Sequence, residues 1–238
     1  MRKIIVILSL FFLASCSEEN KIEKKFVNPF EDSGKMHNEI LDIFYSKNQV
    51  NSKASITEKI KIIDEYFINE KGYKFSFSEI INSKSNLSSY FETLNSCSFN
   101  YEDGYNLLNE LKENSEISIN EFNFANNLLM LMEKNSSNSN SIILNINELE
   151  ENILNNTNYS SEEQEKFLNV LAITKYSIEY WNNNSSKTNS KGMPWYVKDS
   201  VGAMTGMSTG LVGYATLLAG PIGGSLALIG SAAFSSMI

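Results

Sequence analysis

The sequence predicts an all-α fold, an antiparallel helical bundle that ends in a glycine-rich, apolar helical hairpin. Three observations lead to this prediction. Apolar residues recur at helical spacing between residues 34 and 181, several segments begin with helix-capping patterns, and no segment has the alternation typical of strands. After Asp199 no charged side chain follows as far as Ile238, and most of the glycines lie in that last stretch.

The first sixteen residues combine a basic start, an apolar run and a cysteine. The apolar run, Ile4–Ala14, is too short to span a bilayer as a stable helix. It closes with the tetrapeptide LASC at residues 13–16, which resembles the lipobox of bacterial lipoproteins. The resemblance implies that residues 1–15 are a signal peptide and that Cys16 is lipidated and becomes the first residue. The alternative is an ordinary secretory leader that contains a cysteine.

The residues after the cysteine bear on its destination. Two or three acyl chains on Cys16 would suffice for stable membrane attachment. Ser17 follows rather than aspartate, so the resemblance does not indicate retention at an inner membrane, and Glu18-Glu19 resembles the export signal of surface lipoproteins in Bacteroidetes. We therefore expect the bacterial cell envelope, at the outer membrane on its periplasmic or surface side. Residues 16–33 are expected to hold the lipidated cysteine and a polar tether.

A second motif opens the body of the chain. Asn-Pro-Phe at residues 28–30 is followed by the pattern G-x-x-H-N-x-x-L-D at residues 34–42. This resembles the start of a group of uncharacterised helical lipoproteins from Bacteroidetes, which implies a family but no activity, so the roles of His37, Asn38 and Asp42 stay unknown. His37 has no second metal ligand at useful spacing. We expect His37 and Asn38 to cap the first helix or to tie it to the body.

Residues 34–181 are expected to form the helical domain. A serine followed three positions later by a glutamate predicts helix starts with capping boxes at Ser55, Ser118 and Ser160. Apolar residues at helical spacing follow each start, which predicts one buried face per helix. The polar breaks between these segments are short, and short connections favour antiparallel packing of successive helices.

The sequence contains no recognisable catalytic motif. It lacks a phosphate-binding glycine loop, a nucleophile elbow and a cluster of cysteine and histidine. The acidic groups at residues 148–151 and 162–165 are expected to be solvated helix faces, and Cys97 is expected to be a small buried apolar side chain. We therefore expect a non-enzymatic protein without a cofactor or a metal site. The alternative, an envelope enzyme, would need His37 to converge with several carboxylates around a pocket.

The charge of the chain bears on its partners. The formal net charge is -8. Removal of Arg2 and Lys3 with the leader leaves 18 basic against 28 acidic residues, a net charge of -10. An acidic chain repels nucleic acid and anionic lipid at long range, so no nucleic-acid partner is expected.

Two features lead into the uncharged C-terminal stretch. Residues 182–193 are rich in asparagine and serine and predict a flexible linker. Pro194 suits the first turn of a helix, and Trp195, Tyr196 and Lys198 follow it. Aromatic residues and a cation just before an uncharged run are typical of a membrane interface, so these three residues are predicted to be interfacial.

Residues 194–238 are predicted to form the hairpin. Gly220-Pro221 divides the uncharged run into Ser200–Ala219 and Ile222–Ile238, each near the shortest length that spans a bilayer. The glycines predicted to pack helices or to contact a membrane are Gly202, Gly206, Gly210, Gly213, Gly220 and Gly224. Their pattern resembles the glycine-zipper segments of membrane-inserting proteins and of some bacteriocin-like peptides. Each interior glycine costs about 1 kcal/mol relative to alanine in water, so close packing must offset this cost.

These observations lead to one functional expectation and two alternatives. The expectation is a non-enzymatic, lipid-anchored envelope protein whose hairpin associates with or inserts into a membrane. Its partners are then membrane lipid, through Cys16 and the tail, and further copies of the chain through the tail. The first alternative is a binding or structural module whose apolar tail packs into its own helical core. The second, a bare disordered tail, is disfavoured because so apolar a segment should not stay in water.

Overall fold

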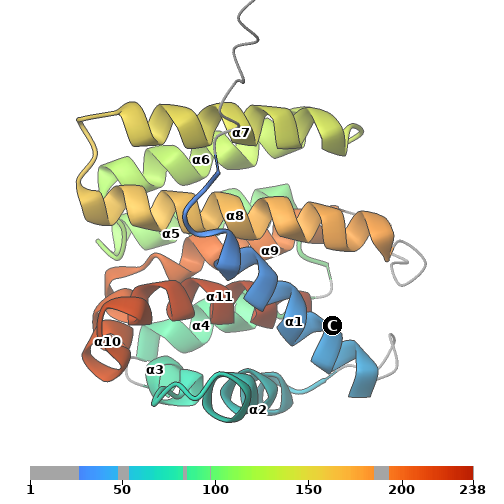
Figure 1. The fold of residues 1–238 in the computed structure, drawn as a ribbon, viewed down its shortest axis with the longest axis vertical. Coiled ribbons are helices and arrows are strands. Elements are labelled where there is room, and N and C mark those ends of the chain that lie inside the picture. The colour runs from blue at the N-terminus through green and yellow to red at the C-terminus, as the bar shows by residue number, and fades with distance from the viewer. Residues whose placement is uncertain (1–26, 48–53, 83–84, 97, 185–192, 238) are drawn as a thin grey trace, which may run out of the picture.

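The computed structural model describes residues 27–47, 54–82, 85–96, 98–184 and 193–237 (Figure 1). The predicted signal peptide, Cys16, Cys97 and most of the predicted linker lie outside the described residues. Within the described ranges the fold is all-α, with no strand, which confirms the predicted class.

Helices account for most of the described chain, and short connections join many of them. In order they are α1 (Glu31–Lys47), α2 (Ile56–Glu65), the π-helical turn η1 (Tyr66–Glu70), α3 (Phe77–Asn82), α4 (Ser85–Leu94), α5 (Tyr101–Glu113), α6 (Ile119–Lys134), α7 (Ser139–Asn155), α8 (Ser161–Asn183), α9 (Trp195–Gly206), α10 (Thr209–Ala219), the 3-10 turn η3 (Gly220–Ile222) and α11 (Gly223–Ser236).

Local sequence explains several of the helix starts. The side chains of Ser55, Ser118 and Ser160 each accept a hydrogen bond from the backbone N–H three residues on. The glutamate at that position in turn accepts a hydrogen bond, through its side chain, from the backbone N–H of the serine. Asn100 forms the same reciprocal arrangement with Asp103 at the start of α5. Each cap satisfies two backbone N–H groups that the first turn of a helix leaves unpaired.

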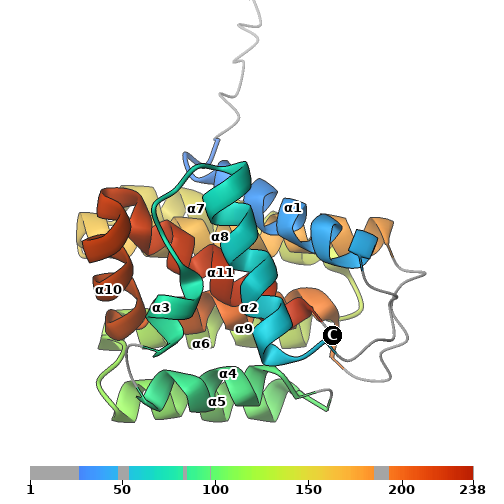
Figure 2. The ribbon, with the colours of Figure 1, turned by 90° about the horizontal axis from the view of Figure 1, so that it is seen from below.

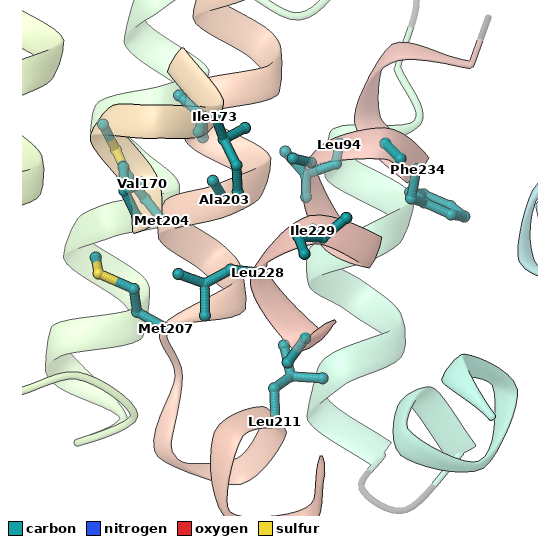
Figure 3. Close-up of a cluster of buried hydrophobic side chains, with 14 of the residues drawn as sticks. Leu94, Val170, Ile173, Ala203, Met204, Met207, Leu211, Leu228, Ile229 and Phe234 are labelled. Atoms are coloured by element: carbon teal, nitrogen blue, oxygen red, sulfur yellow. The ribbon is translucent and has the colours of Figure 1, made fainter. Parts of the chain in front are cut away.

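The C-terminal segment lies at the centre of the fold. In Figure 1, α11 lies between α8 above it and α2 below it, and it also packs on α1, α4, α9 and α10. Figure 3 shows Leu228, Ile229 and Phe234 of α11 meeting side chains from α4, α8, α9 and α10. The Phe234 ring packs edge-to-face on Phe91 of α4, with centroids 5.0 Å apart. The predicted helical domain and the predicted hairpin therefore share one hydrophobic core.

The tail consists of three helices rather than two. The predicted break at Gly220-Pro221 occurs as η3, where Gly220 takes a φ of 71°, a conformation that favours glycine. A further break separates α9 from α10, because Ser208 caps a new helix and accepts a hydrogen bond from the Leu211 N–H. The run after Asp199 is uncharged on both sides of Ser208, so hydropathy alone gave no sign of this break.

One stretch of the described chain, Thr209–Ser236, is long and apolar enough to cross a membrane by length and composition. Its most apolar window has a mean hydropathy of 1.6, and 61% of that window is buried inside the fold. Core helices of soluble proteins have the same composition, so this property alone does not assign a membrane span.

Candidate functional site

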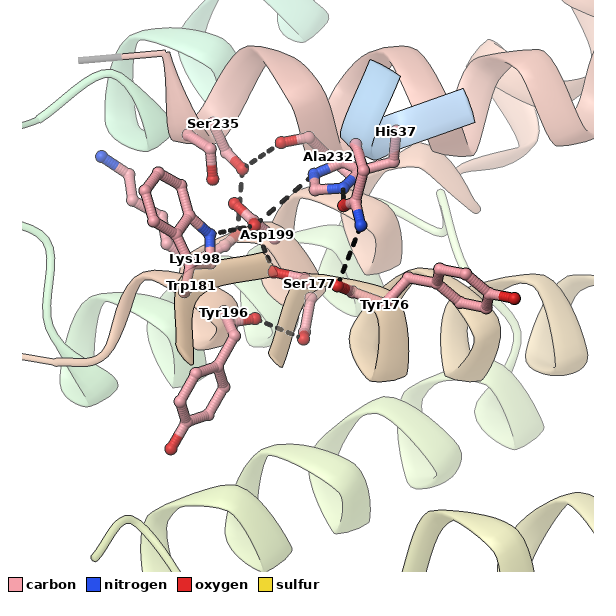
Figure 4. A network of polar contacts seen from close by, with 12 residues as sticks. His37, Tyr176, Ser177, Trp181, Tyr196, Lys198, Asp199, Ala232 and Ser235 are labelled. Atoms are coloured by element: carbon pink, nitrogen blue, oxygen red, sulfur yellow. Dashed lines mark hydrogen bonds and ion pairs between the residues drawn. The ribbon is translucent and has the colours of Figure 1, made fainter. Parts of the chain in front are cut away.

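A buried polar cluster lies where α1, α8 and α9 meet, at the start of the tail (Figure 4). Asp199 of α9 is fully buried, and its Oδ2 accepts hydrogen bonds from the Ser177 hydroxyl and, at 2.8 Å, from Trp181 Nε1. Both donors project from α8. His37 of α1 approaches from the other side, with Nε2 3.5 Å from the same Oδ2. The last charged residue before the uncharged run is thus held by two other helices.

The motif residues His37 and Asn38 tie α1 to this cluster. His37 Nδ1 lies 2.9 Å from Asn38 Oδ1, and Asn38 Nδ2 donates to the Tyr176 carbonyl oxygen of α8 at 3.0 Å. Because the Asn38 amide donates through nitrogen, its oxygen faces the ring, and His37 Nδ1 is the donor in that contact. His37 therefore presents the unprotonated Nε2 of a neutral ring to Asp199. The expected tie between the first helix and the body is present.

Burial moves the pKa values of Asp199 and His37 away from their ordinary values in opposite directions. It raises the pKa of Asp199 to about 7, although the hydrogen bonds from Ser177 and Trp181 oppose the rise. It lowers the pKa of His37 to about 4, and the Asn38 hydrogen bond opposes this fall. Between about pH 4 and pH 7 the proton therefore resides on Asp199, and His37 stays neutral. The pair is a buried acid beside a neutral imidazole rather than a salt bridge.

This cluster supports a positioning role. Both side chains are fully buried, and neither lines the surface cavities beside α1 and α10. His37 Nε2 and Asp199 Oδ1 have no hydrogen-bond partner among the described residues. The convergence of His37 with several carboxylates around a pocket, which the enzyme alternative requires, does not occur within the described ranges. Asp42, the third motif residue, is exposed, and its carboxylate adds to burial in raising the pKa of Tyr180.

Two of the predicted packing glycines lie against α11. A Cβ at Gly202 would come within 2.6 Å of the Ser231 carbonyl oxygen, and one at Gly206 within 2.7 Å of Leu228 Cα. Such distances to backbone atoms leave no space for a side chain, so α9 and α11 approach as closely as they do because both positions are glycine. The Ser235 hydroxyl lies 3.1 Å from the Lys198 carbonyl oxygen and adds a polar contact between the same helices.

The other four glycines have different surroundings. Gly210 is buried, and its N–H donates to Glu116 Oε2 at 3.2 Å. A Cβ at Gly213 or Gly220 would meet nothing within 4 Å, and one at Gly224 would make an ordinary contact with Val212. The spacing of four therefore marks helix contacts at Gly202 and Gly206 of α9.

Of the residues predicted to be interfacial, Tyr196 and Lys198 are buried in this fold and Trp195 is half-buried against the core. Tyr196 and Lys198 are 5% and 3% exposed. Lys198 Nζ donates to the Ser96 carbonyl oxygen at 2.9 Å and lies over the rings of Phe99 and Trp195. A carbonyl oxygen and two ring faces therefore contact this charge inside the fold.

The first residues of the body form a second buried polar contact. Asn28 Nδ2 donates to Glu150 Oε1 at 2.7 Å and lies 2.8 Å from the Leu168 carbonyl oxygen, which fixes the chain entry on α7 and α8. Glu150 also pairs with Lys175 at 2.9 Å. The expectation that Glu150 lies on a solvated helix face is therefore wrong, because Asn28 and Lys175 cover it. A carboxylate flanked by Leu149 and Ile153 on an apolar helix was the available signal.

Comparison with known proteins does not indicate a function for this chain. Searches against protein-family models, curated proteins and solved structures found no significant match. No group of three or more potential metal-ligating side chains occurs among the residues that the structure describes.

Proposed function

We propose that this chain is a lipid-anchored, non-enzymatic module of a bacterial cell envelope whose glycine-rich tail completes the core of its own helical domain. The observation that carries the proposal is the central position of α11, which is buried over nearly its whole length. The lipobox resemblance at Cys16 supports the anchor. The biological task of such a module is binding or structural support at the membrane that holds Cys16.

The contacts of the tail favour packing in the core over a free hairpin. Gly202 and Gly206 bring α9 onto α11, and the Tyr45 hydroxyl of α1 donates to the Ser236 carbonyl oxygen at 2.6 Å. These contacts offset the cost of interior glycines without any lipid. Loss of α11 would expose the apolar faces of α1, α8 and α9 that it covers. The free energy lost with that apolar burial exceeds the usual free energy of unfolding of a domain of this size.

A truncation tests the packed tail. The chain with Cys16→Ser is compared with the same chain ending at Ser190, both in buffer without lipid. We expect one cooperative thermal transition, followed by near-UV circular dichroism, for the longer chain and none for the shorter. A cooperative transition in the shorter chain would show that the helical domain folds without its tail and would refute the packed arrangement.

The anchor is tested by acylation. The chain is produced in bacteria supplied with a labelled fatty acid, and the Cys16→Ser variant is the control. We expect label in the parent and none in the variant. Equal labelling of the two proteins would contradict the assignment of Cys16.

A second candidate function is insertion of the tail into a membrane, and the composition of Thr209–Ser236 favours it. In this function α10 and α11 leave the core on contact with lipid. Dye release from liposomes that needs residues 191–238 would support insertion. Binding without release would favour the packed module.

A further inference from the structure

We infer that α10 and η3 form a membrane-docking face of the folded protein, and that the partner of this face is the surface of an uncharged lipid bilayer. The inference rests on the proposed anchor and adds the part of the folded domain that meets the membrane. It requires no rearrangement of the core.

The exposure of α10 is the first observation. This helix buries Gly210, Leu211 and Ala215 and leaves Leu217 83% exposed. Ile222 of η3 is 40% exposed, and Val212, Tyr214 and Leu218 are half-buried. Adjacent apolar side chains that stay accessible on a folded surface mark interaction sites, whereas scattered single ones do not.

The shape of the surface around η3 is the second observation. A cavity of about 500 Å³ lies between α8, α10 and α11, with Val212, Leu217 and Leu228 in its lining. Another, of about 620 Å³, lies between α1, η3 and α11, with Phe30 and Ile222 in its lining. Pro221 and Ser225 line both, so η3 is a ridge between two furrows with apolar side chains in their walls. Figure 2 shows α10 at the edge of the fold, outside the packed helices.

The position of the chain entry is the third observation, and it selects lipid as the occupant. Pro29 and Phe30 line the second furrow together with Pro221 and Ile222, so the first described residues lie beside η3. Cys16 precedes Val27 by eleven residues, a span of at most about 40 Å when fully extended. A bilayer that holds Cys16 is therefore always within reach of α10 and η3, and tethering raises its effective concentration at this face.

The charges determine which bilayer the face suits. The described residues of α10 and η3 carry no charge, and the chain as a whole is acidic. The linings of the two furrows hold charges of both signs, the acids Asp32, Glu39, Glu162 and Glu165 against the bases Lys35, Lys71 and Lys166. Contact is therefore driven by apolar burial and opposed by anionic lipid. We expect binding to phosphatidylcholine vesicles to be stronger than binding to vesicles with phosphatidylglycerol, and to lose nothing at high salt.

Two exposed leucines provide a matched test. Residues 16–238 with Cys16→Ser contain every described residue, and Leu217→Asp is compared in that chain with Leu144→Asp. Leu144 of α7 is 65% exposed, so neither change should alter the thermal transition. In sedimentation with phosphatidylcholine vesicles we expect Leu217→Asp to weaken binding about tenfold or more, and Leu144→Asp to leave it unchanged. Vesicles loaded with dye should retain it.

Each other outcome overturns the inference. Equal binding by all three chains would show that α10 does not face lipid, and absence of binding by the parent would remove the docking face. A lipid-independent dimer that Leu217→Asp dissociates would assign the face to a second copy. Stronger binding to anionic vesicles, or dye release, would replace apolar docking by electrostatic attraction or by insertion. None of these results alters the truncation test, so failure of the docking face and failure of the packed tail are distinguishable.

Discussion

α10 and α11 come from the same uncharged, glycine-rich run, yet they occupy opposite environments. Nearly all of α11 is buried in the core, whereas α10 buries three of its eleven residues. The two helices are joined only by η3. Hydropathy therefore does not decide which of them is core. The decision comes from the helices that meet them, because α11 contacts α1, α2, α4, α8 and α9, and α10 lies at the edge (Figures 1 and 2).

The largest expected effect is a difference in the free energy of unfolding between variants at two leucines, one in each of these helices. Leu228 of α11 is 1% exposed and Leu217 of α10 is 83% exposed. Leu228→Ala should lower the free energy of unfolding by about 2–5 kcal/mol, because it removes apolar burial and leaves a cavity. Leu217→Ala should change it by less than about 0.5 kcal/mol. Urea denaturation of both variants measures this, and equal losses would mean that α10 is packed as tightly as α11.

The second expected effect concerns two glycines that lie seven residues apart, Gly206 of α9 and Gly213 of α10. Gly206→Ala should destabilise by about 1–3 kcal/mol, because the new Cβ would lie 2.7 Å from Leu228 Cα. Gly213→Ala should stabilise by about 0.5–1 kcal/mol, because a helical glycine is replaced where nothing lies within 4 Å. Thermal unfolding of the two variants gives both signs. Stabilisation by both would show that α9 and α11 are not in backbone contact.

In the unaltered chain the smallest expected effect is a pH dependence, which single variants uncover. Folding raises the pKa of Asp199 from 3.8 to about 7, so the stability it contributes is full below pH 4 and is lost as pH rises through 7. Folding lowers the pKa of His37 from 6.5 to about 4, so its contribution is full above pH 6.5 and is lost as pH falls through 4. Between pH 4 and 6.5 the two slopes have opposite signs and largely cancel.

Removal of either partner leaves the slope of the other. Relative to the parent, Asp199→Asn should gain stability as pH rises from 4 to 7, and His37→Gln should lose stability as pH rises from 4 to 6.5. Each slope is at most about 1.4 kcal/mol per pH unit. Denaturant unfolding from pH 4 to 8 measures both variants. Slopes of the same sign would contradict the assignment of a protonated acid beside a neutral imidazole.

Local features of the fold were predictable from sequence, and long-range pairs were not. Three helix starts could be predicted because a capping box is complete within four residues, at Ser55, Ser118 and Ser160. The break at Gly220-Pro221 could be predicted because the backbone geometry of these two residues interrupts a helix. The burial of Glu150 depends on Asn28, which is 122 residues away. Such a partner cannot be found from spacing along the chain.

The candidate site follows the same rule. His37 was recognisable as part of a motif, but its neighbour Asp199 lies on the ninth helix and is brought to it by the packing of α1 and α9 on α8. One signal did point to Asp199, since it is the single acid at the edge of a long uncharged run. An isolated acid in that position must either reach water or find partners inside the fold.

Hydrogen exchange of the backbone amides, without lipid, tests most directly whether α11 is the core of the folded domain. We expect the amides of Leu226 to Phe234 to exchange only through global unfolding, at the slowest rates in the protein, and those of Gly213 to Leu218 to exchange at least a hundredfold faster through local opening, on the order expected for a peripheral helix. Rapid exchange throughout α11 would show that the tail does not hold the domain together in water, and would contradict the account.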